Sequence, residues 1–138
     1  MKLLYDAHLA FRKNISPKLL KYGLKSGNHR ILLYVSNHPG CLQKDIAENC
    51  DVETSTLSTV LSNMEKKGLI VRKRFENNNR SYAIYLTESG QNISEDSLKH
   101  LIDSSEVALK GFSPKEAEEF RSYLKRIIKN LKEANKNL

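Results

Sequence analysis

The fold is decided by residues 52–90, which read VETSTLSTVLSNMEKKGLIVRKRFENNNRSYAIYLTESG. Four apolar residues in this stretch follow the spacing i, i+3, i+4 and i+7: Leu57, Val60, Leu61 and Met64. This spacing predicts a helix over residues 54–67 with one stripe facing a core. Gly68 follows two lysines and predicts the helix end. Residues 69–74 and 81–86 then predict two strands of a hairpin, joined by a turn-rich tip.

Within the second predicted strand, alternation places Tyr82, Ile84 and Leu86 inward and Ala83 and Tyr85 outward. The tip, residues 75–80, is rich in asparagine, which favours turns.

The outer face of the predicted helix carries hydroxyl and amide side chains and no acidic one. Ser, Thr and Asn are mediocre helix formers, so solubility alone explains them poorly. They can donate to phosphates and reach base edges in a major groove. The candidate DNA contacts here are Thr54, Ser55, Thr56, Ser58, Thr59, Ser62 and Asn63. The alternative is a Ser/Thr-rich helix that faces only solvent.

The predicted hairpin is strongly basic. Residues 66–80 contain six basic side chains and one acidic side chain. A basic hairpin beside a neutral polar helix is typical of nucleic-acid binding, and arginine at a hairpin tip suits a narrow minor groove. The candidate contacts of the hairpin are Arg72, Lys73, Arg74, Asn78 and Arg80. An ordinary solvated hairpin is the alternative.

Four segments of the chain resemble the MarR (multiple antibiotic resistance regulator) family of winged helix-turn-helix transcription factors. The segments are LQKDIA (42–47), VETSTL (52–57), MEKKGLIVR (64–72) and LTESG (86–90). The resemblance that these segments carry in this order spans essentially the whole chain. The resemblance implies a mainly α fold with a small β-hairpin wing (α+β). It also implies a sequence-specific regulator that binds double-stranded DNA, often as a repressor released by a small ligand or signal.

One position departs from the family pattern. The family usually has an aspartate two residues before the arginine that matches Arg80, whereas this chain has Asn78. An aspartate there can brace the wing by pairing with arginine, so the resemblance leaves the wing geometry open. Asparagine keeps a turn-forming side chain and removes a charge that would repel phosphate.

The segment before residue 52 completes a helix-turn-helix. Ser26 can cap a helix whose apolar stripe includes Ile31, and the run Pro39-Gly40 follows it. Residues 43–49 predict the first helix of the motif and residues 50–52 its turn. Two side chains at the start of the first helix, Gln43 and Lys44, are candidate phosphate contacts.

The two ends of the chain predict helices with unpaired apolar faces. Residues 88–109 predict a long polar helix after Thr87, with Gly90 as an early weak point. Ser113 and Glu116 form a capping box that starts a last amphipathic helix. The apolar positions of the long helix are Ile93, Leu98, Leu101, Ile102 and Leu109.

In the resembled family the terminal helices form a homodimer interface. The candidate dimer contacts are Leu4, Ala7, Phe11, Phe120, Leu124, Ile127 and Leu131. The predicted organisation is one domain, 1–138, with a winged helix-turn-helix at 26–87 and dimerisation parts at 1–22 and 88–138. A dimer would present two helices to half-sites about one helical turn apart, so the operator should be nearly palindromic. Packing of these helices on their own core is the alternative.

The composition fits a basic single domain. The 138 residues carry a formal net charge of +7, and residues 12–44 hold seven basic side chains and no acidic one.

No stretch is long and apolar enough to span a bilayer, and the first residues lack the apolar region of a signal peptide, so a cytoplasmic location is expected. No enzyme motif or cofactor site is recognisable. A winged-helix module that binds another protein remains the alternative function.

The sequence does not identify which residues of such a regulator would sense its signal. Cys41 and Cys50 flank the predicted first helix, too far apart for a disulfide, and are more typical of small buried residues than of redox sensors. The four histidines, His8, His29, His38 and His100, form no metal-ligand motif. A metal site assembled across a dimer is the alternative. Four aromatic side chains are either core or the lining of an effector pocket: Tyr5, Phe11, Tyr22 and Tyr34.

Overall fold

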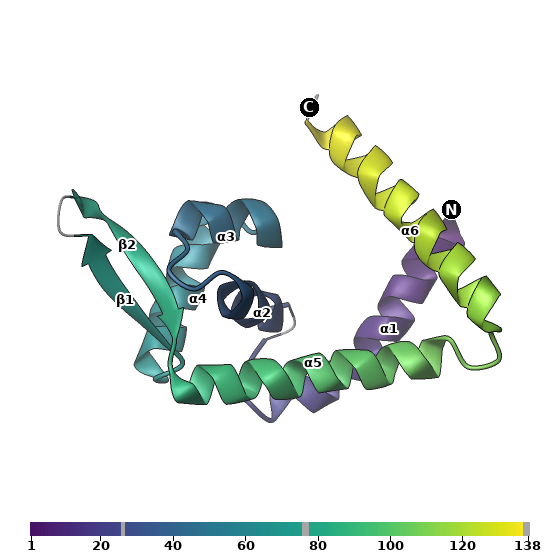
Figure 1. The fold of residues 1–138 in the computed structure, drawn as a ribbon, viewed down its shortest axis with the longest axis horizontal. Helices are drawn as coiled ribbons and strands as arrows, with labels where there is room; N and C mark the ends of the chain where they lie inside the picture. Colours follow the sequence, from purple (N-terminus) through teal and green to yellow (C-terminus); the bar gives the residue numbers. More distant parts are fainter. Residues whose placement is uncertain (26, 76–77, 137–138) are drawn as a thin grey trace. The chain divides into compact units, whose positions relative to one another are not determined.

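The structure, a computed structural model, describes residues 1–25, 27–75 and 78–136, and the side chains of residues 78–80 lie outside the description. It contains two compact units, Met1–Ser104 and Ser105–Leu138, which are described separately. The elements are α1 (Lys2–Leu20), α2 (His29–Asn37), α3 (Gln43–Cys50), α4 (Thr54–Lys66), β1 (Ile70–Phe75), β2 (Asn78–Leu86), α5 (Glu88–Ala108) and α6 (Pro114–Asn135), as labelled in Figure 1. The predicted class, mainly helical with a β-hairpin wing, is confirmed.

The core of the first unit lies between α2, α3, α4 and the base of the hairpin. It includes buried residues from each of these elements: Ile31, Leu32, Val35, Ile46, Leu57, Leu61, Met64, Ile70 and Ile84. The predicted stripe of α4 is therefore confirmed, with Val60 only partly buried at its edge. Ser26, the predicted cap of α2, lies outside the described residues, and Asn28 holds the N-cap position. No helix within the described residues has the length and apolar character needed to cross a membrane.

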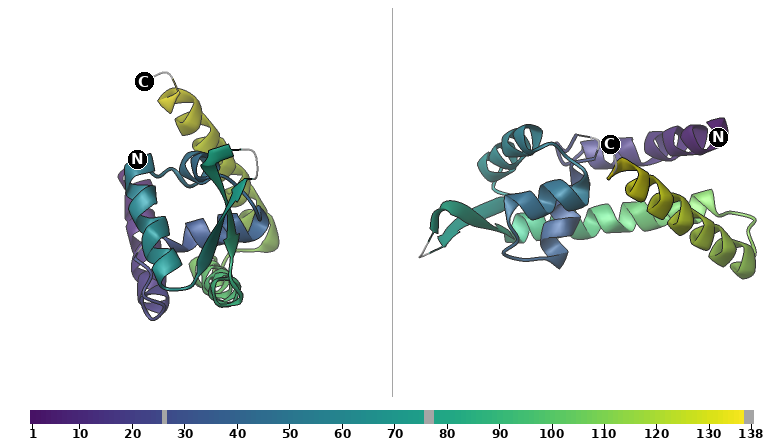
Figure 2. Two further views of the ribbon diagram at one scale, coloured as in Figure 1. Left: turned by 90° about the vertical axis from the view of Figure 1, so that its left-hand side faces the viewer. Right: turned by 90° about the horizontal axis from the view of Figure 1, so that it is seen from above.

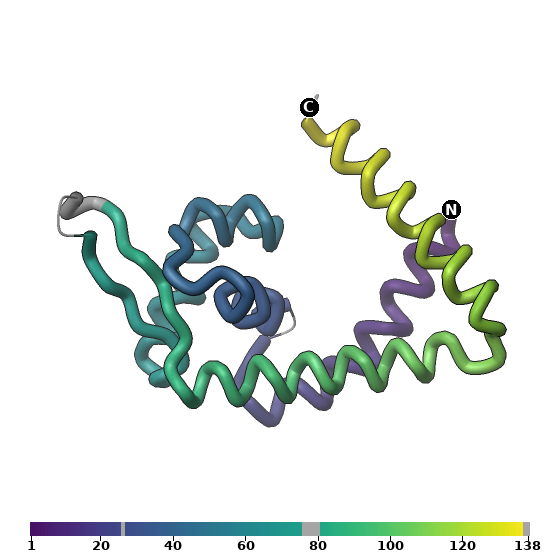
Figure 3. The backbone as a smooth tube through the Cα atoms, in the orientation of Figure 1, coloured from purple at the N-terminus to yellow at the C-terminus, as the bar shows by residue number. Residues whose placement is uncertain are grey.

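The hairpin is longer than predicted. The tube in Figure 3 shows the chain passing from α4 into β1 and returning through β2 to α5. The strands pair from Ile70 with Leu86 to Phe75 with Asn78, with an irregularity after Arg74. The strand backbone thus reaches Asn78, where the sequence predicted a turn, because the register places Phe75 and Asn78 opposite each other. Figure 1 and the right-hand view of Figure 2 show the hairpin extending beyond α2, α3 and α4.

One side of β2 differs from the predicted alternation. Ala83 is buried, although it was expected to face outward. It stands opposite Lys73 in the antiparallel register, and the Lys73 ammonium reaches 5.0 Å from the centre of the Tyr85 ring. Because directly paired residues and i, i+2 neighbours share one face of a sheet, Ala83 lies on the same face as these two long side chains.

The junction between the hairpin and α5 depends on Thr87 and Gly90. The Thr87 hydroxyl accepts a hydrogen bond from the Gly90 N–H at 3.1 Å and donates to the Gly68 carbonyl at 2.6 Å, so the predicted N-cap is confirmed. A Cβ atom at Gly90 would lie 2.0 Å from the Leu69 carbonyl oxygen. Gly90 is therefore a site of close backbone approach and not the weak point that was predicted.

Helix α5 buries serines where apolar side chains were expected. Ser94, Ser97 and Ser104 are buried, whereas Leu98 and Ile102 are about half exposed. Small side chains let neighbouring helices approach closely, and polar contacts tie this face to α1 and α2. Lys18 of α1 donates to the Ser104 hydroxyl at 3.2 Å, and Ser36 of α2 donates to the Gln91 side-chain oxygen at 3.0 Å. The apolar stripe predicted for this helix is therefore wrong at Leu98 and Ile102, whereas Ile93 packs against the core as predicted.

The second unit contains α6. The Ser113 hydroxyl accepts from the Glu116 N–H, and the Glu116 carboxylate accepts from the Ser113 N–H at 2.7 Å, so the predicted capping box is confirmed. These hydrogen bonds lower the pKa of the Glu116 carboxyl. No residue of Pro114–Asn135 is buried.

Candidate nucleic-acid interface

The outer face of α4 is open to solvent in the described structure. Six of its seven candidate side chains are exposed: Thr54, Ser55, Thr56, Ser58, Thr59 and Asn63. Leu57 and Leu61 anchor the opposite face in the core with no measurable exposure. The helix therefore presents short hydroxyl and amide groups on a rigid support, which is the geometry that readout of base edges needs.

Ser62 is the exception on α4, because it faces the wing. Its hydroxyl accepts a hydrogen bond from the Arg72 guanidinium at 3.2 Å. The Arg72 Nε atom also lies 3.6 Å from the Glu65 carboxylate, in an ion pair slightly longer than a hydrogen bond. The Arg72 side chain is only 18% exposed. Direct DNA contacts by Ser62 and Arg72 remain predictions, while in the structure the pair joins β1 to α4.

The exposed cations of the wing make cation–π contacts with tyrosine rings. Arg74 lies over Tyr82, with 5.3 Å between its guanidinium carbon and the ring centre, and its Nε donates to the Tyr82 hydroxyl at 3.1 Å. Lys73 lies similarly over Tyr85. Cation–π contacts restrict long side chains without neutralising them. The wing thus holds two positive charges in defined places, ready for an anionic partner.

Sequence reasoning did not assign these tyrosines to the interface. Arg74 and Tyr82 are direct partners in the strand register. Pairing the two predicted strands residue by residue would have suggested the contact. The side chains of two further candidates, Asn78 and Arg80, lie outside the description, so their roles stay predictions.

At the start of α3, some features favour phosphate binding and one opposes it. Lys44 is exposed and Gln43 is partly exposed, as phosphate contacts require. However, the Asp45 carboxylate accepts a hydrogen bond from the Leu42 N–H at 3.0 Å. This carboxylate occupies one donor at the helix end and places a negative charge beside the predicted phosphate position. Phosphate binding here remains a prediction.

A groove of about 450 Å³ borders the outer face of α4. The connection from α1 to α2 forms its other wall, and it is lined by Gly23, Leu24, Lys25, Asn28, Thr56, Thr59, Val60, Asn63, Met64 and Lys67. None of the four aromatic side chains considered as pocket residues lines this groove. Tyr22 and Tyr34 instead pack against the core, which supports the structural alternative for those two.

The candidate dimer contacts are largely uncovered. Phe120 and Leu131 in α6 are 42% and 56% exposed, Leu124 and Ile127 are partly exposed, and Ala7 of α1 is exposed. Leu4 and Phe11 are partly exposed. Such apolar faces favour association, but the homodimer remains a prediction.

The cysteines have the properties of structural thiols. Burial, followed by the negative charge of Asp45, raises the pKa of Cys41 to about 11. Burial also raises the pKa of Cys50, whose thiol lies 3.6 Å from the Arg30 carbonyl oxygen. Because the thiolate is the reactive form, both should react slowly. Among the described residues, no group of three His, Cys, Asp or Glu is placed to hold a metal ion.

Comparisons with known proteins agree on one family. The model of the MarR family matches residues 22–81. An uncharacterized HTH-type transcriptional regulator of Bacillus subtilis, YwhA, is 32% identical over 100 residues, which cover 72% of this chain and 69% of that protein. The chain belongs to the MarR family. It is therefore a transcriptional regulator and not an enzyme.

Two further comparisons extend over most of the chain. The organic hydroperoxide resistance transcriptional regulator of Bacillus subtilis is 29% identical over 133 residues, covering 96% of this chain and 89% of the relative. A MarR-family regulator of Listeria monocytogenes, solved with a 26mer DNA, is 25% identical. That structure covers 94% of this chain and 87% of its own, with a TM-score of 0.84. The winged helix-turn-helix of this chain is thus the MarR fold.

Proposed function

We propose that this MarR-family regulator binds double-stranded DNA through the outer face of α4 and the wing. The observation that supports this most is the exposed row of hydroxyl and amide groups on α4, which contains no carboxylate from Thr54 to Asn63. The wing adds exposed Lys73 and Arg74 beside it. The similarity to the Listeria monocytogenes regulator solved with a 26mer DNA supports the same assignment.

In this proposal α4 enters the major groove and its exposed outer face reads base edges. The hydroxyls of Thr54, Ser55, Thr56, Ser58 and Thr59 and the amide of Asn63 are the reading groups. Lys73, Arg74 and Arg80 contact phosphates or the minor groove, and Asn78 lies near them at the end of the wing. Gln43 and Lys44 contribute phosphate contacts from the start of α3.

The regulator acts as a homodimer on a nearly palindromic operator. The uncovered apolar positions of α1 and α6 support dimerisation, because a helix as amphipathic as α6 gains free energy by covering its apolar face. Two copies of α4 then meet half-sites about one helical turn apart. The protein represses transcription from such sites in the cytoplasm.

Release from the operator follows binding of a small molecule that favours a form unable to bind DNA. Oxidation of Cys41 or Cys50 is a poorer signal, because burial raises the pKa of both thiols. We therefore propose no peroxide response at these two cysteines, although one relative is an organic hydroperoxide resistance regulator.

The alternative function is a winged-helix module that binds another protein. The salt dependence of duplex binding distinguishes the two functions. Binding to a duplex of random sequence is measured by fluorescence anisotropy at two salt concentrations. Phosphate contacts make the affinity fall steeply with salt, and a Lys73→Gln and Arg74→Gln double variant should lower the logarithmic slope by about 2. An absence of binding even at low salt would overturn the proposed function.

A further inference from the structure

The connection after α1 joins three parts of the first unit. Gly23 adopts a positive φ of +69° in this connection. The Lys67 ammonium, just after the end of α4, donates a hydrogen bond to the Gly23 carbonyl oxygen at 2.7 Å. A Cβ atom at position 23 would lie 3.0 Å from this ammonium nitrogen, so glycine leaves room for the close contact. The contact links positions 44 residues apart in the chain.

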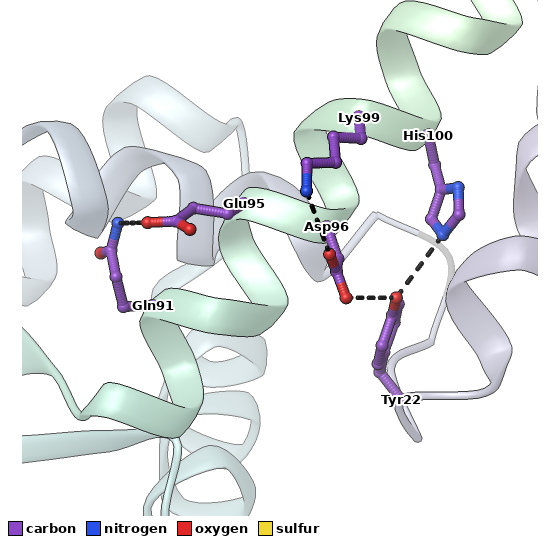
Figure 4. A network of polar contacts seen from close by, with 6 residues as sticks. All are labelled: Tyr22, Gln91, Glu95, Asp96, Lys99 and His100. Atoms are coloured by element: carbon purple, nitrogen blue, oxygen red, sulfur yellow. Dashed lines mark hydrogen bonds and ion pairs between the residues drawn. The ribbon is translucent and has the colours of Figure 1, made fainter.

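The neighbouring residue, Tyr22, reaches α5. Its hydroxyl donates to the Asp96 carboxylate at 3.0 Å and lies 3.5 Å from Nε2 of His100 (Figure 4). Lys99 approaches the other oxygen of Asp96 at 3.9 Å, so the carboxylate is held from two sides. The Tyr22 ring itself packs against the core.

Two consecutive residues therefore connect the end of the reading helix α4 to α1 and to the middle of α5. The next residue, Leu24, is buried in the core and anchors the connection there. Charge-assisted hydrogen bonds are stronger than neutral ones, so the Lys67 contact resists sliding of α4 against the end of α1. We call residues 22, 23, 67 and 96 the joint.

We propose that Lys67 is a positioning residue, which sets the direction of α4 through the joint and thereby determines which half-site spacing the regulator accepts. This inference rests on the proposed function, because spacing has meaning only for a DNA-binding dimer. A lysine at the end of a reading helix would ordinarily be assigned to phosphate. Here its ammonium lies 2.7 Å from a backbone carbonyl oxygen, which takes at least one of its three donors.

The adjacent Lys66 supplies a matched control. It has the same charge, lies in the last turn of α4 and is exposed. Removing a phosphate contact lowers the salt slope of binding by about 1 and weakens all sites about equally. Removing a positioning contact leaves the slope unchanged and reduces the preference for one spacing over others.

The test uses palindromic duplexes whose half-sites are separated by the best spacing or by one or two base pairs more or fewer. Full-length wild type, Lys67→Gln, Lys66→Gln and Tyr22→Phe are compared by anisotropy at several salt concentrations. For Lys67→Gln and for Tyr22→Phe, the ratio of affinities between the best and the altered spacings should fall by about three- to tenfold at an unchanged salt slope. Lys66→Gln should keep the wild-type ratio.

Each other outcome has a defined meaning. A Lys67→Gln variant that keeps the spacing ratio overturns the inference, whether its salt slope falls by about 1, as for a phosphate contact, or stays unchanged. If Lys67→Gln does not fold, Tyr22→Phe carries the test, because it removes only the hydroxyl of the joint, and an unchanged ratio then overturns the inference. Wild type that binds no duplex refutes the proposed function itself, whereas a wild-type spacing preference unaffected by the variants refutes only the joint.

Discussion

Replacing Gly90 by alanine tests the packing that connects the wing to α5. In an ordinary helix this change stabilises the protein by about 0.5 to 1 kcal/mol, because alanine is the better helix former. Here the added Cβ would lie 2.0 Å from the Leu69 carbonyl oxygen. That oxygen belongs to the backbone and already accepts a hydrogen bond from Thr87 at 3.0 Å. The clash cannot be relieved by rotating a side chain.

The expected loss in the free energy of unfolding follows from the contacts that must move. A shift of about 1 Å between α5 and the segment before β1 disrupts the two hydrogen bonds that join them: Thr87 N–H to Leu69 and Thr87 hydroxyl to Gly68. At about 1 kcal/mol each the loss is about 2 kcal/mol, which the gain in helix propensity reduces to about 1 to 1.5 kcal/mol. For a chain of this size the melting temperature should fall by about 3 to 7 °C.

Thermal and urea unfolding of Gly90→Ala and wild type are compared at equal protomer concentration, because the proposed dimerisation would make the melting temperature depend on concentration. The matched control is Ser89→Ala, an exposed position in the same helical turn, which should change stability by less than about 0.5 kcal/mol. A Gly90→Ala protein as stable as wild type, or more stable, would refute the close approach.

Four other predictions concern the wing, the dimer and the buried groups. Arg80→Ala should weaken operator binding by about 1 to 3 kcal/mol with an intact circular dichroism spectrum, and unchanged affinity would exclude the role. Leu124→Asp should halve the mass measured by light scattering, and a persistent dimer would argue against the interface. Burial, and then Arg30, lower the pKa of His29; the unfolded chain therefore binds the proton more readily, and the free energy of unfolding should fall as the pH drops below about 6.5. His29→Gln should lose this part of the pH dependence, and an unaltered pH profile would contradict it. Cys41 should react with iodoacetamide at pH 7.4 much more slowly than free cysteine, and an equal rate would contradict its raised pKa.

Features encoded within a few neighbouring residues were predictable from the sequence. The apolar spacing of Leu57, Leu61 and Met64 identified the buried side of α4, and the structure confirms it. The capping box at Ser113 was equally local, since both of its hydrogen bonds join residues three apart. The resemblance of the four short segments to MarR proteins supplied the order of the elements.

Features that depend on contacts between distant residues were not predictable. Gly90 looked like a weak point because its neighbour, the Leu69 carbonyl, is 21 positions away and belongs to another element. Arg72 looked like a free cation because nothing in the sequence places Ser62 within its reach.

The serine face of α5 was missed for a different reason. Apolar periodicity ranks Leu98 and Ile102 above Ser94 and Ser97 as core residues, whereas close helix packing favours the small side chains. Hydrophobicity predicts what gains free energy by burial, and it does not predict how near two helices lie.

The central claim is that this chain binds DNA with two-fold symmetry through α4 and the wing. Selection of bound sequences from a pool of random duplexes tests it most directly. The account predicts enrichment of a nearly palindromic motif whose half-sites lie about one helical turn apart. A pool that remains random after repeated selection at low salt, or a motif without two-fold symmetry, would contradict the claim.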